Sequence, residues 1–152
     1  MDTSITILII GTIIQAVISI ITLISVIFIF KTIMSNEQIN KNNLFNEIVK
    51  QERELKIKLL EYRDIINNSK INNIKRNETK LDYDTLLFNY YEFLSICIYQ
   101  NLINEKESKL FFKEPIKSVR EIFDSSILFK EGYAKKEQYK ALQWLFKKWN
   151  IQ

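Results

Sequence analysis

The chain has 152 residues, of which 22 are Lys or Arg and 18 are Asp or Glu, giving a formal net charge of +4. It contains no histidine, which excludes histidine-based acid–base catalysis, histidine-containing catalytic triads and histidine-ligated zinc. A single cysteine, Cys97, excludes an intramolecular disulfide, and the scarcity of glycine and proline argues against an all-β fold.

The first predicted element is a transmembrane anchor over residues 1–33. No charged residue occurs from Thr3 to Phe30, and this stretch is longer than the roughly 20 residues that cross a bilayer as a helix. A cleaved signal peptide, the main alternative, is disfavoured because no positive segment precedes the run and no small-residue cleavage site ends it. The positive residues that follow the run predict a single-pass protein of the cell membrane, with its N-terminus outside and its C-terminal domain cytoplasmic: Lys31, Lys41, Lys50 and Arg53.

Small and polar residues of this anchor fall on one face, within an arc of about 140° at 100° per residue. Such residues let membrane helices approach closely, and the amide of Gln15 is costly to leave unpaired in hydrocarbon. We therefore predict self-association, or docking onto another membrane protein, through Gly11, Thr12, Gln15, Ser19, Thr22 and Ser25. Two alternatives stay open: the hydroxyl groups bond only to their own backbone, or the stripe lines a pore.

Residues 34–66 are predicted to form one long amphipathic helix. Apolar side chains recur on a stripe about 100° wide: Leu44, Phe45, Ile48, Leu55, Leu59, Tyr62 and Ile66. A coiled-coil stalk and the first helix of a bundle are both open, and the small number of regular heptads favours the bundle helix.

Residues 67–80 are predicted to form an Asn-rich basic loop, because Asn and Ser side chains compete with a helix for backbone hydrogen bonds. Its positive side chains are candidates for contact with phosphate groups of lipid or nucleic acid: Lys70, Lys75, Arg76 and Lys80. The alternative is an ordinary solvated surface loop.

Residues 81–152 are predicted to form a helical bundle domain. The segment from Asp84 to Asn101 is apolar nearly all round, which is typical of a central helix; a second membrane span is the alternative. Asn104 and Glu107 form the pattern of a capping box at the start of the next helix.

Proline and glycine divide the rest of this domain. Pro115 is expected to stop or kink the helix that begins after Asn104, and then to start another. Gly132 is expected to mark a turn, and the last helix is expected over 134–150.

No side-chain pattern in this sequence indicates an enzyme, and we expect no catalytic residue, cofactor or metal. Glu92 lies in the apolar segment, where pairing with an Arg or Lys is the expected explanation. Asp82 and Asp84 are expected to cap a helix, and Glu114 and Asp124 are the remaining carboxylates of interest.

Four short motifs occur in the second half of the chain: Asn89-Tyr90-Tyr91-Glu92-Phe93-Leu94, Asn101-Leu102-Ile103-Asn104-Glu105, Leu110-Phe111-Phe112, and the spaced set Tyr139, Leu142, Leu145 and Trp149. Together they resemble a family of uncharacterised prokaryotic and phage proteins that carry one N-terminal membrane helix and a helical domain of unknown function. The resemblance implies a membrane-tethered accessory or effector protein, found in prophages or beside phage-defence genes, and it supplies no catalytic residues.

Taken together, these features predict an all-α protein with a single N-terminal transmembrane helix followed by a four- or five-helix cytoplasmic bundle. We expect a membrane-tethered interaction or accessory module that oligomerises through its anchor, in phage defence or exclusion. One alternative is a nucleic-acid or nucleotide sensor coupled to a membrane-disrupting effector, with Tyr90, Tyr91, Trp144 and Trp149 as candidate stacking residues. Another is a membrane-permeabilising effector acting alone.

Overall fold

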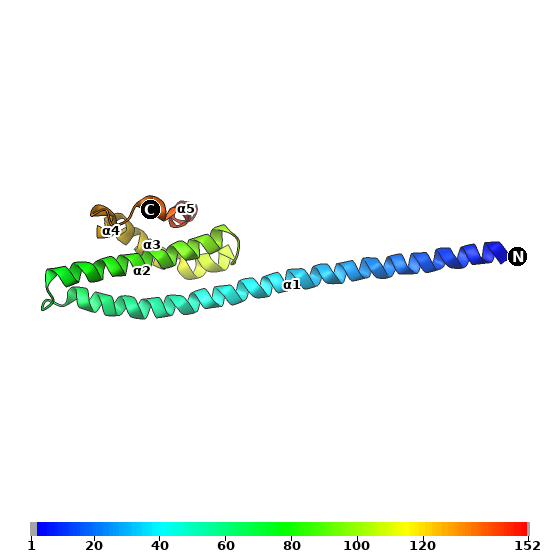
Figure 1. Cartoon of the computed structure of the whole chain (residues 1–152), viewed down its shortest axis with the longest axis horizontal. Coiled ribbons are helices and arrows are strands. Elements are labelled where there is room, and N and C mark those ends of the chain that lie inside the picture. The colour runs from blue at the N-terminus through cyan, green and yellow to red at the C-terminus, as the bar shows by residue number, and fades with distance from the viewer. Residues whose placement is uncertain (1–2, 152) are drawn as a thin grey trace. The chain divides into compact units, whose positions relative to one another are not determined.

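The computed structural model describes the backbone of residues 3–151 and the side chains of Gln15 and residues 18–151 (Figure 1). The chain divides into two compact units, Met1–Asn40 and Lys41–Gln152, here called unit 1 and unit 2. The described backbone is helical apart from short connections and contains no strand. The predicted all-α fold is therefore confirmed.

Helix α1 covers Thr3–Asn67 and contributes to both units. It passes through the predicted boundary at residues 33 and 34 without interruption. The remaining helices belong to unit 2: α2 (Asn73–Tyr99), α3 (Glu105–Ser125), the short α4 (Ile127–Lys130), the 3-10 helix η1 (Lys136–Gln138) and α5 (Lys140–Lys148).

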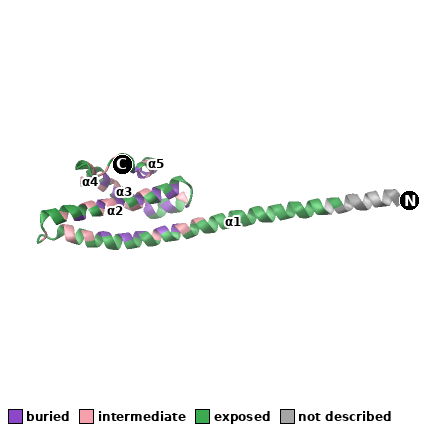
Figure 2. Ribbon diagram, in the orientation of Figure 1, coloured by how far each residue is buried: buried purple, intermediate pink, exposed green. Residues whose placement is uncertain are grey.

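In unit 2, residues 41–67 of α1 run antiparallel to α2 (Figure 1). The hydroxyl of Tyr90 donates a hydrogen bond to the carbonyl of Ile48 at 2.8 Å, whereas Leu59 near the other end of α1 lines a hollow with Tyr83. Buried residues recur on this part of α1, including Phe45, Ile48 and Leu55 (Figure 2). This part of α1 is therefore a helix of the bundle, as the sequence analysis favoured.

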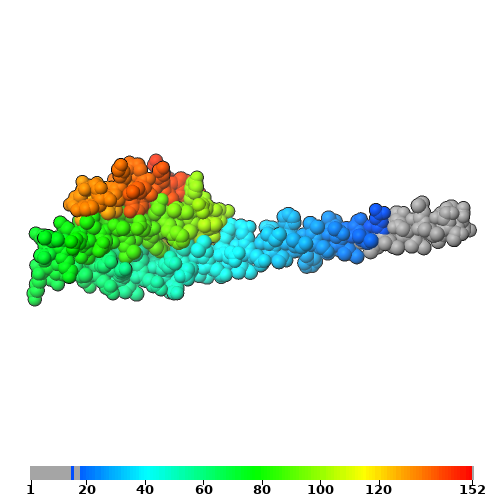
Figure 3. Space-filling model, viewed as in Figure 1, coloured from blue at the N-terminus to red at the C-terminus, as the bar shows by residue number. Residues whose placement is uncertain are grey.

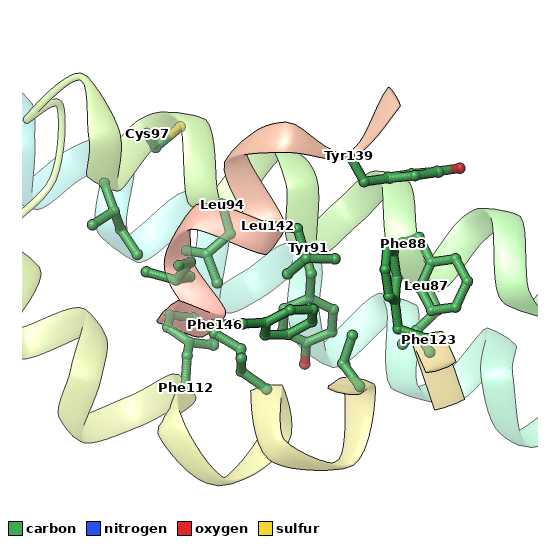
Figure 4. Close-up of a cluster of buried hydrophobic side chains, with 14 of the residues drawn as sticks. Leu87, Phe88, Tyr91, Leu94, Cys97, Phe112, Phe123, Tyr139, Leu142 and Phe146 are labelled. Atoms are coloured by element: carbon green, nitrogen blue, oxygen red, sulfur yellow. The ribbon is translucent and has the colours of Figure 1, made fainter. Parts of the chain in front are cut away.

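Helix α2 is the central element of unit 2, because it contacts α3, α4 and α5 on the sides that α1 leaves free. Its buried side chains meet those of α3 and α5 in the core of the unit (Figure 4). Four aromatic rings from different elements form one cluster in which every pair of ring centroids lies 4.7–6.0 Å apart: Phe88, Phe123, Phe129 and Tyr139. Edge-to-face and offset ring pairs of this kind add to the stabilisation that burial provides.

Asn residues begin and end several of these helices. The side chain of Asn72 accepts a hydrogen bond from the backbone N–H of Lys75, and Asn104 accepts from Lys106 and Glu107, which confirms the predicted cap. Asn101 and Asn150 have positive φ values of 57° and 52° just after α2 and α5, a conformation that Asn tolerates well. Gly132, with φ of 78°, occupies the predicted turn.

Three predicted boundaries are wrong. The loop predicted over 67–80 is helical from Asn73 onward, because Asn72 acts as an N-cap and a following helix buries Thr79 and Asp84. Pro115 lies inside α3, so it does not end one helix and start another; the buried face on both sides of it offsets the lost backbone hydrogen bond. The helix predicted over 134–150 is split into η1 and α5, where Tyr139 turns into the aromatic cluster.

Candidate functional site

Unit 1 presents apolar side chains over its described surface. The large apolar residues from Ile18 to Met34 are each between 46% and 67% exposed (Figure 2). Within the described side chains, one helix is long and apolar enough to cross a membrane, and none of the residues in its apolar window is buried. Unit 1 therefore has the length and composition of a membrane span, and none of its described side chains is buried in a protein core.

The predicted association stripe is described from Gln15 onward, and Gly11 and Thr12 lie outside the described side chains. Gln15 is exposed. The hydroxyl groups of Ser19, Thr22 and Ser25 each donate to the backbone carbonyl four residues earlier, at 2.8–2.9 Å. These donors are therefore used within the helix, which is one of the alternatives left open above, and the amide of Gln15 is the stronger candidate for contact between helices.

The four predicted phosphate contacts come from two parts of unit 2. Lys70 lies in the connection between α1 and α2, whereas Lys75, Arg76 and Lys80 lie in the first turns of α2. The Arg76 guanidinium donates to the carbonyls of Asn68 and Ile71 and to the side chain of Asn73, at 3.2–3.5 Å. Arg76 therefore ties this connection together, while the three lysines are exposed.

The aromatic residues considered for base stacking are mostly enclosed. Tyr91 and Trp149 are buried, and the Trp149 indole N–H donates to Glu105 at 3.2 Å. Tyr90 is half-buried and bonded to Ile48. Trp144 is half-buried as well, with the Tyr99 ring packed edge-to-face on it at 5.0 Å between centroids. This surface offers little room for stacking on bases.

Glu92 has a partner that the sequence analysis did not anticipate. Its carboxylate accepts hydrogen bonds from the backbone N–H groups of Ala141 at 3.0 Å and Leu142 at 2.7 Å. These N–H groups belong to the first turn of α5, whose preceding residue, Tyr139, makes no side-chain cap bond. The expectation of an Arg or Lys partner is wrong, because the unpaired N–H groups at the start of a helix provide the positive field instead.

Asp84 is buried within α2, with 2% of its surface exposed, and does not cap that helix as expected. The hydroxyl of Ser126 donates to its carboxyl group, and the Ser126 oxygen in turn accepts from the N–H of Leu128 at the start of α4. Burial raises the pKa of Asp84 above its ordinary value, although Ser126 and Lys80 oppose the rise. Asp82 is exposed and lies in the interior of α2, well after its N-cap Asn72, so it does not cap the helix either.

The other carboxylates of interest form ion pairs. Glu114 is 2.6 Å from Lys117, and Asp124 contacts both Arg120 at 2.9 Å and Lys136 at 3.1 Å. Among the described residues, no group of three or more His, Cys, Asp or Glu side chains is arranged to hold a metal ion. Four of the five carboxylates of interest therefore take part in contacts within the fold: Glu92, Asp84, Glu114 and Asp124. The fifth, Asp82, is exposed.

Helix α5 packs beside α2 (Figure 3), and two shallow hollows lie along these two helices. One hollow of about 410 Å³ is lined by Asn89, Glu92, Phe93, Ile96, Gln138 and Tyr139. The next, of about 430 Å³, is lined by Glu92, Tyr99, Lys140, Ala141 and Trp144. We call these two hollows the α2 groove. Phe93, Ile96 and Tyr99 are exposed in it, so its floor is largely apolar.

Comparison with known proteins adds the family and nothing about a partner. A family model described as a domain of unknown function, DUF4760, matches residues 9–149. No curated protein and no solved structure matches the chain. The resemblance noted in the sequence is confirmed at this level, since the match covers both the apolar segment and the helical domain. The chain belongs to the DUF4760 family of domains of unknown function.

Proposed function

We propose that this protein is a membrane-tethered interaction module, in which unit 1 spans the cell membrane and unit 2 binds other proteins. The observation that carries the proposal is the exposure of the large apolar side chains from Ile18 to Met34. An unbroken apolar helix with no protein packed against it is unfavourable in water and favourable in hydrocarbon.

The charges that flank the apolar segment support an orientation. Lys31 follows the segment directly. Lys41, Lys50 and Arg53 follow it within unit 2. Positive residues beside a membrane helix are retained on the cytoplasmic side. We therefore propose that unit 2 lies in the cytoplasm and that the N-terminal side of the span faces outside.

The α2 groove supports binding rather than catalysis. Its exposed apolar side chains, Phe93, Ile96 and Tyr99, follow one another along α2 at spacings of three residues, which suits the apolar face of a partner helix. Glu92, the carboxylate within the groove, already accepts two backbone hydrogen bonds. It is therefore engaged in supporting α5.

The proposal includes self-association through unit 1 and a role as an accessory component in phage defence or exclusion. Gln15 supports the first part, because an exposed amide in hydrocarbon gains most from a partner amide on a second copy. The second part rests on the resemblance described from the motifs of residues 89–149. Both the self-association and the accessory role require membrane attachment, so the attachment is the first property to test.

Membrane fractionation of the full-length chain tests the attachment. We expect the protein in the membrane pellet after an alkaline carbonate wash, with release only by detergent. Ile18→Arg combined with Ile21→Arg places two charges near the centre of the span, at a cost of about 2.5–3.5 kcal/mol each, and is expected to abolish the attachment. Ile74→Arg, at an exposed apolar position of unit 2, is the matched control. A wild-type chain that stays in the supernatant without detergent contradicts the proposal.

A further inference from the structure

A second apolar surface lies in unit 2, at the end where α2 leads into α3. Leu110 on α3 is 85% exposed and Phe111 beside it is 60% exposed, and Leu102 in the preceding connection is exposed as well. We call these three residues the α3 patch. Leu110 is the most exposed large apolar residue among the described side chains, and it lies on the face of α3 opposite the buried Phe112, Ile116 and Val119.

The α3 patch lies at the end of unit 2 that the chain enters from unit 1. The ring of Phe111 packs edge-to-face on Phe45 of α1, with ring centroids 5.5 Å apart, and Phe45 is only four positions after Lys41, where unit 2 begins. The opposite end of the unit is the connection between α1 and α2. Ile74 lies there, about 40 Å from Leu102 along the 27 residues of α2 at 1.5 Å per residue.

The chain itself limits how far this end can lie from the membrane. Ten residues, 31–40, separate the uncharged apolar segment from unit 2. They span about 15 Å as a helix and at most about 35 Å when fully extended. If unit 1 spans the bilayer, the end of unit 2 that carries the α3 patch is therefore held near the bilayer surface.

Lysines lie on one side of Leu110 and glutamates on the other. Lys106 and Lys113 share the face of Leu110 at helical spacings of four and three residues, and Lys109 is exposed beside it, whereas Glu107 and Glu114 lie between Leu110 and Phe111. Glu114 pairs with Lys117 at 2.6 Å and Glu105 with Lys148 at 2.8 Å. The three lysines set against Glu107 leave an excess of positive charge on one side of the apolar patch, the combination that binds the interface of an anionic membrane.

We propose that the α3 patch inserts Leu110 and Phe111 into the interface of the same anionic bilayer that holds unit 1, so that unit 2 contacts the membrane at a second point. This inference rests on the proposed membrane attachment. The patch then fixes the tilt of unit 2 over the membrane surface and determines which side of the α2 groove faces the cytoplasm. A second copy of the chain is the competing occupant of the patch.

The test uses the full chain in vesicles, labelled through a new cysteine. Leu110→Cys carries an environment-sensitive fluorophore, and Ile74→Cys, 71% exposed in the native chain, carries it at the opposite end as the control. Cys97 is buried and its burial raises the pKa of its thiol, so it should remain unlabelled. The vesicles contain phosphatidylcholine, with or without phosphatidylglycerol, and lipids with a nitroxide on the acyl chain as quencher.

We expect the fluorophore at residue 110 to shift to shorter wavelength and to lose most of its emission to the nitroxide lipids, while that at residue 74 changes little. The loss should be greater with phosphatidylglycerol and smaller when Lys106→Glu and Lys113→Glu are added. If the protein floats with the vesicles but the two positions are quenched equally, the inference is overturned. It is also overturned if neither position is quenched. Equal quenching with and without phosphatidylglycerol overturns the assignment to an anionic surface.

Two further outcomes separate the competing explanations. A fluorophore at residue 110 that is shielded from aqueous iodide but untouched by nitroxide lipids is covered by protein, which overturns the inference in favour of a second copy. A full chain that does not float with the vesicles at all overturns both this inference and the proposed membrane attachment.

Discussion

Glu92 and Leu142 are joined by a hydrogen bond of 2.7 Å in which the backbone N–H at the start of α5 donates to a carboxylate on α2. The neighbouring N–H of Ala141 donates to the other oxygen of the same carboxylate at 3.0 Å. A carboxylate 50 positions earlier in the chain thus supplies the capping acceptor that Tyr139, the N-cap residue of α5, does not. The contact fixes α5 in direction as well as in place, because only the N-terminal end of a helix presents free N–H groups.

Removal of this cap should destabilise unit 2. Glu92→Ala leaves two half-buried N–H groups without an acceptor, and we expect a loss of about 2 kcal/mol in the free energy of unfolding. Glu92→Gln keeps one acceptor oxygen and should lose about half as much. Thermal unfolding of the full chain in detergent, followed by circular dichroism, measures both, with the exposed Glu121→Ala on α3 as control. Equal melting temperatures for Glu92→Ala and Glu121→Ala would contradict the role.

Asp84 should make stability depend on pH in the opposite sense to an ordinary ion-paired carboxylate. Burial raises its pKa in the folded protein above the usual 3.8, so the folded state favours the protonated form. The cost of ionisation appears as the pH rises through the unfolded pKa and is complete above the folded pKa. Asp84→Asn removes that cost and keeps an acceptor for Ser126. We therefore expect this variant to be no less stable than the wild type at neutral pH.

The pH series provides the check on Asp84. The advantage of Asp84→Asn over the wild type should shrink as the pH falls through the folded pKa, and it should be gone below the unfolded pKa, where both side chains are neutral. Asp84→Ala, which leaves the Ser126 hydroxyl without its acceptor, should be less stable by about 1–3 kcal/mol. Urea unfolding at several pH values measures the three proteins side by side. An advantage of Asp84→Asn that grows toward acid would show that the carboxylate is stabilised in its charged form.

Arg76 should stabilise the connection between α1 and α2. Its guanidinium reaches the carbonyls of Asn68 and Ile71, so Arg76→Ala is expected to cost about 1 kcal/mol and to speed amide hydrogen exchange at residues 68–72. Lys75→Ala, next to it but exposed, should change stability by less than about 0.5 kcal/mol. Exchange rates in 68–72 that are identical in the two variants would leave Arg76 without this structural role.

Gln15 should carry the self-association of unit 1. Gln15→Leu removes the exposed amide and keeps the helix apolar, so we expect a weaker signal in a membrane two-hybrid assay. Ile20→Leu, on the opposite face of the helix, is the control and should leave the signal unchanged. Association that survives Gln15→Leu would remove the amide from the interface.

Local patterns in the sequence are enough to predict much of this fold. The uncharged segment from Thr3 to Phe30 and the apolar periodicity of residues 44–66 predict helices that the structure contains. Asn104 is the N-cap of α3 and Gly132 lies in a turn, as predicted, and the φ of Gly132 there is positive. These features depend on neighbours within a few positions, where residue type and spacing carry the information.

Contacts between distant residues could not be predicted in the same way. A glutamate in an apolar segment has the same pattern whether its partner is an arginine or the start of a helix, and the partners of Glu92 lie 49 and 50 positions away. Asp84 meets Ser126 across 42 positions for the same reason. Pro115 is the opposite case. Proline is locally unfavourable inside a helix, yet α3 continues through Pro115 because the buried face of α3 packs on the rest of unit 2.

The sequence by itself determined that the chain is helical and that its N-terminal segment has the length and apolar character of a membrane span, because both depend on composition and period along the chain. The tertiary structure decided which carboxylates support helices, where the α2 groove lies, and that Leu110 and Phe111 stay exposed beside Phe45. Those outcomes depend on which helix faces pack together, and no local pattern encodes that choice.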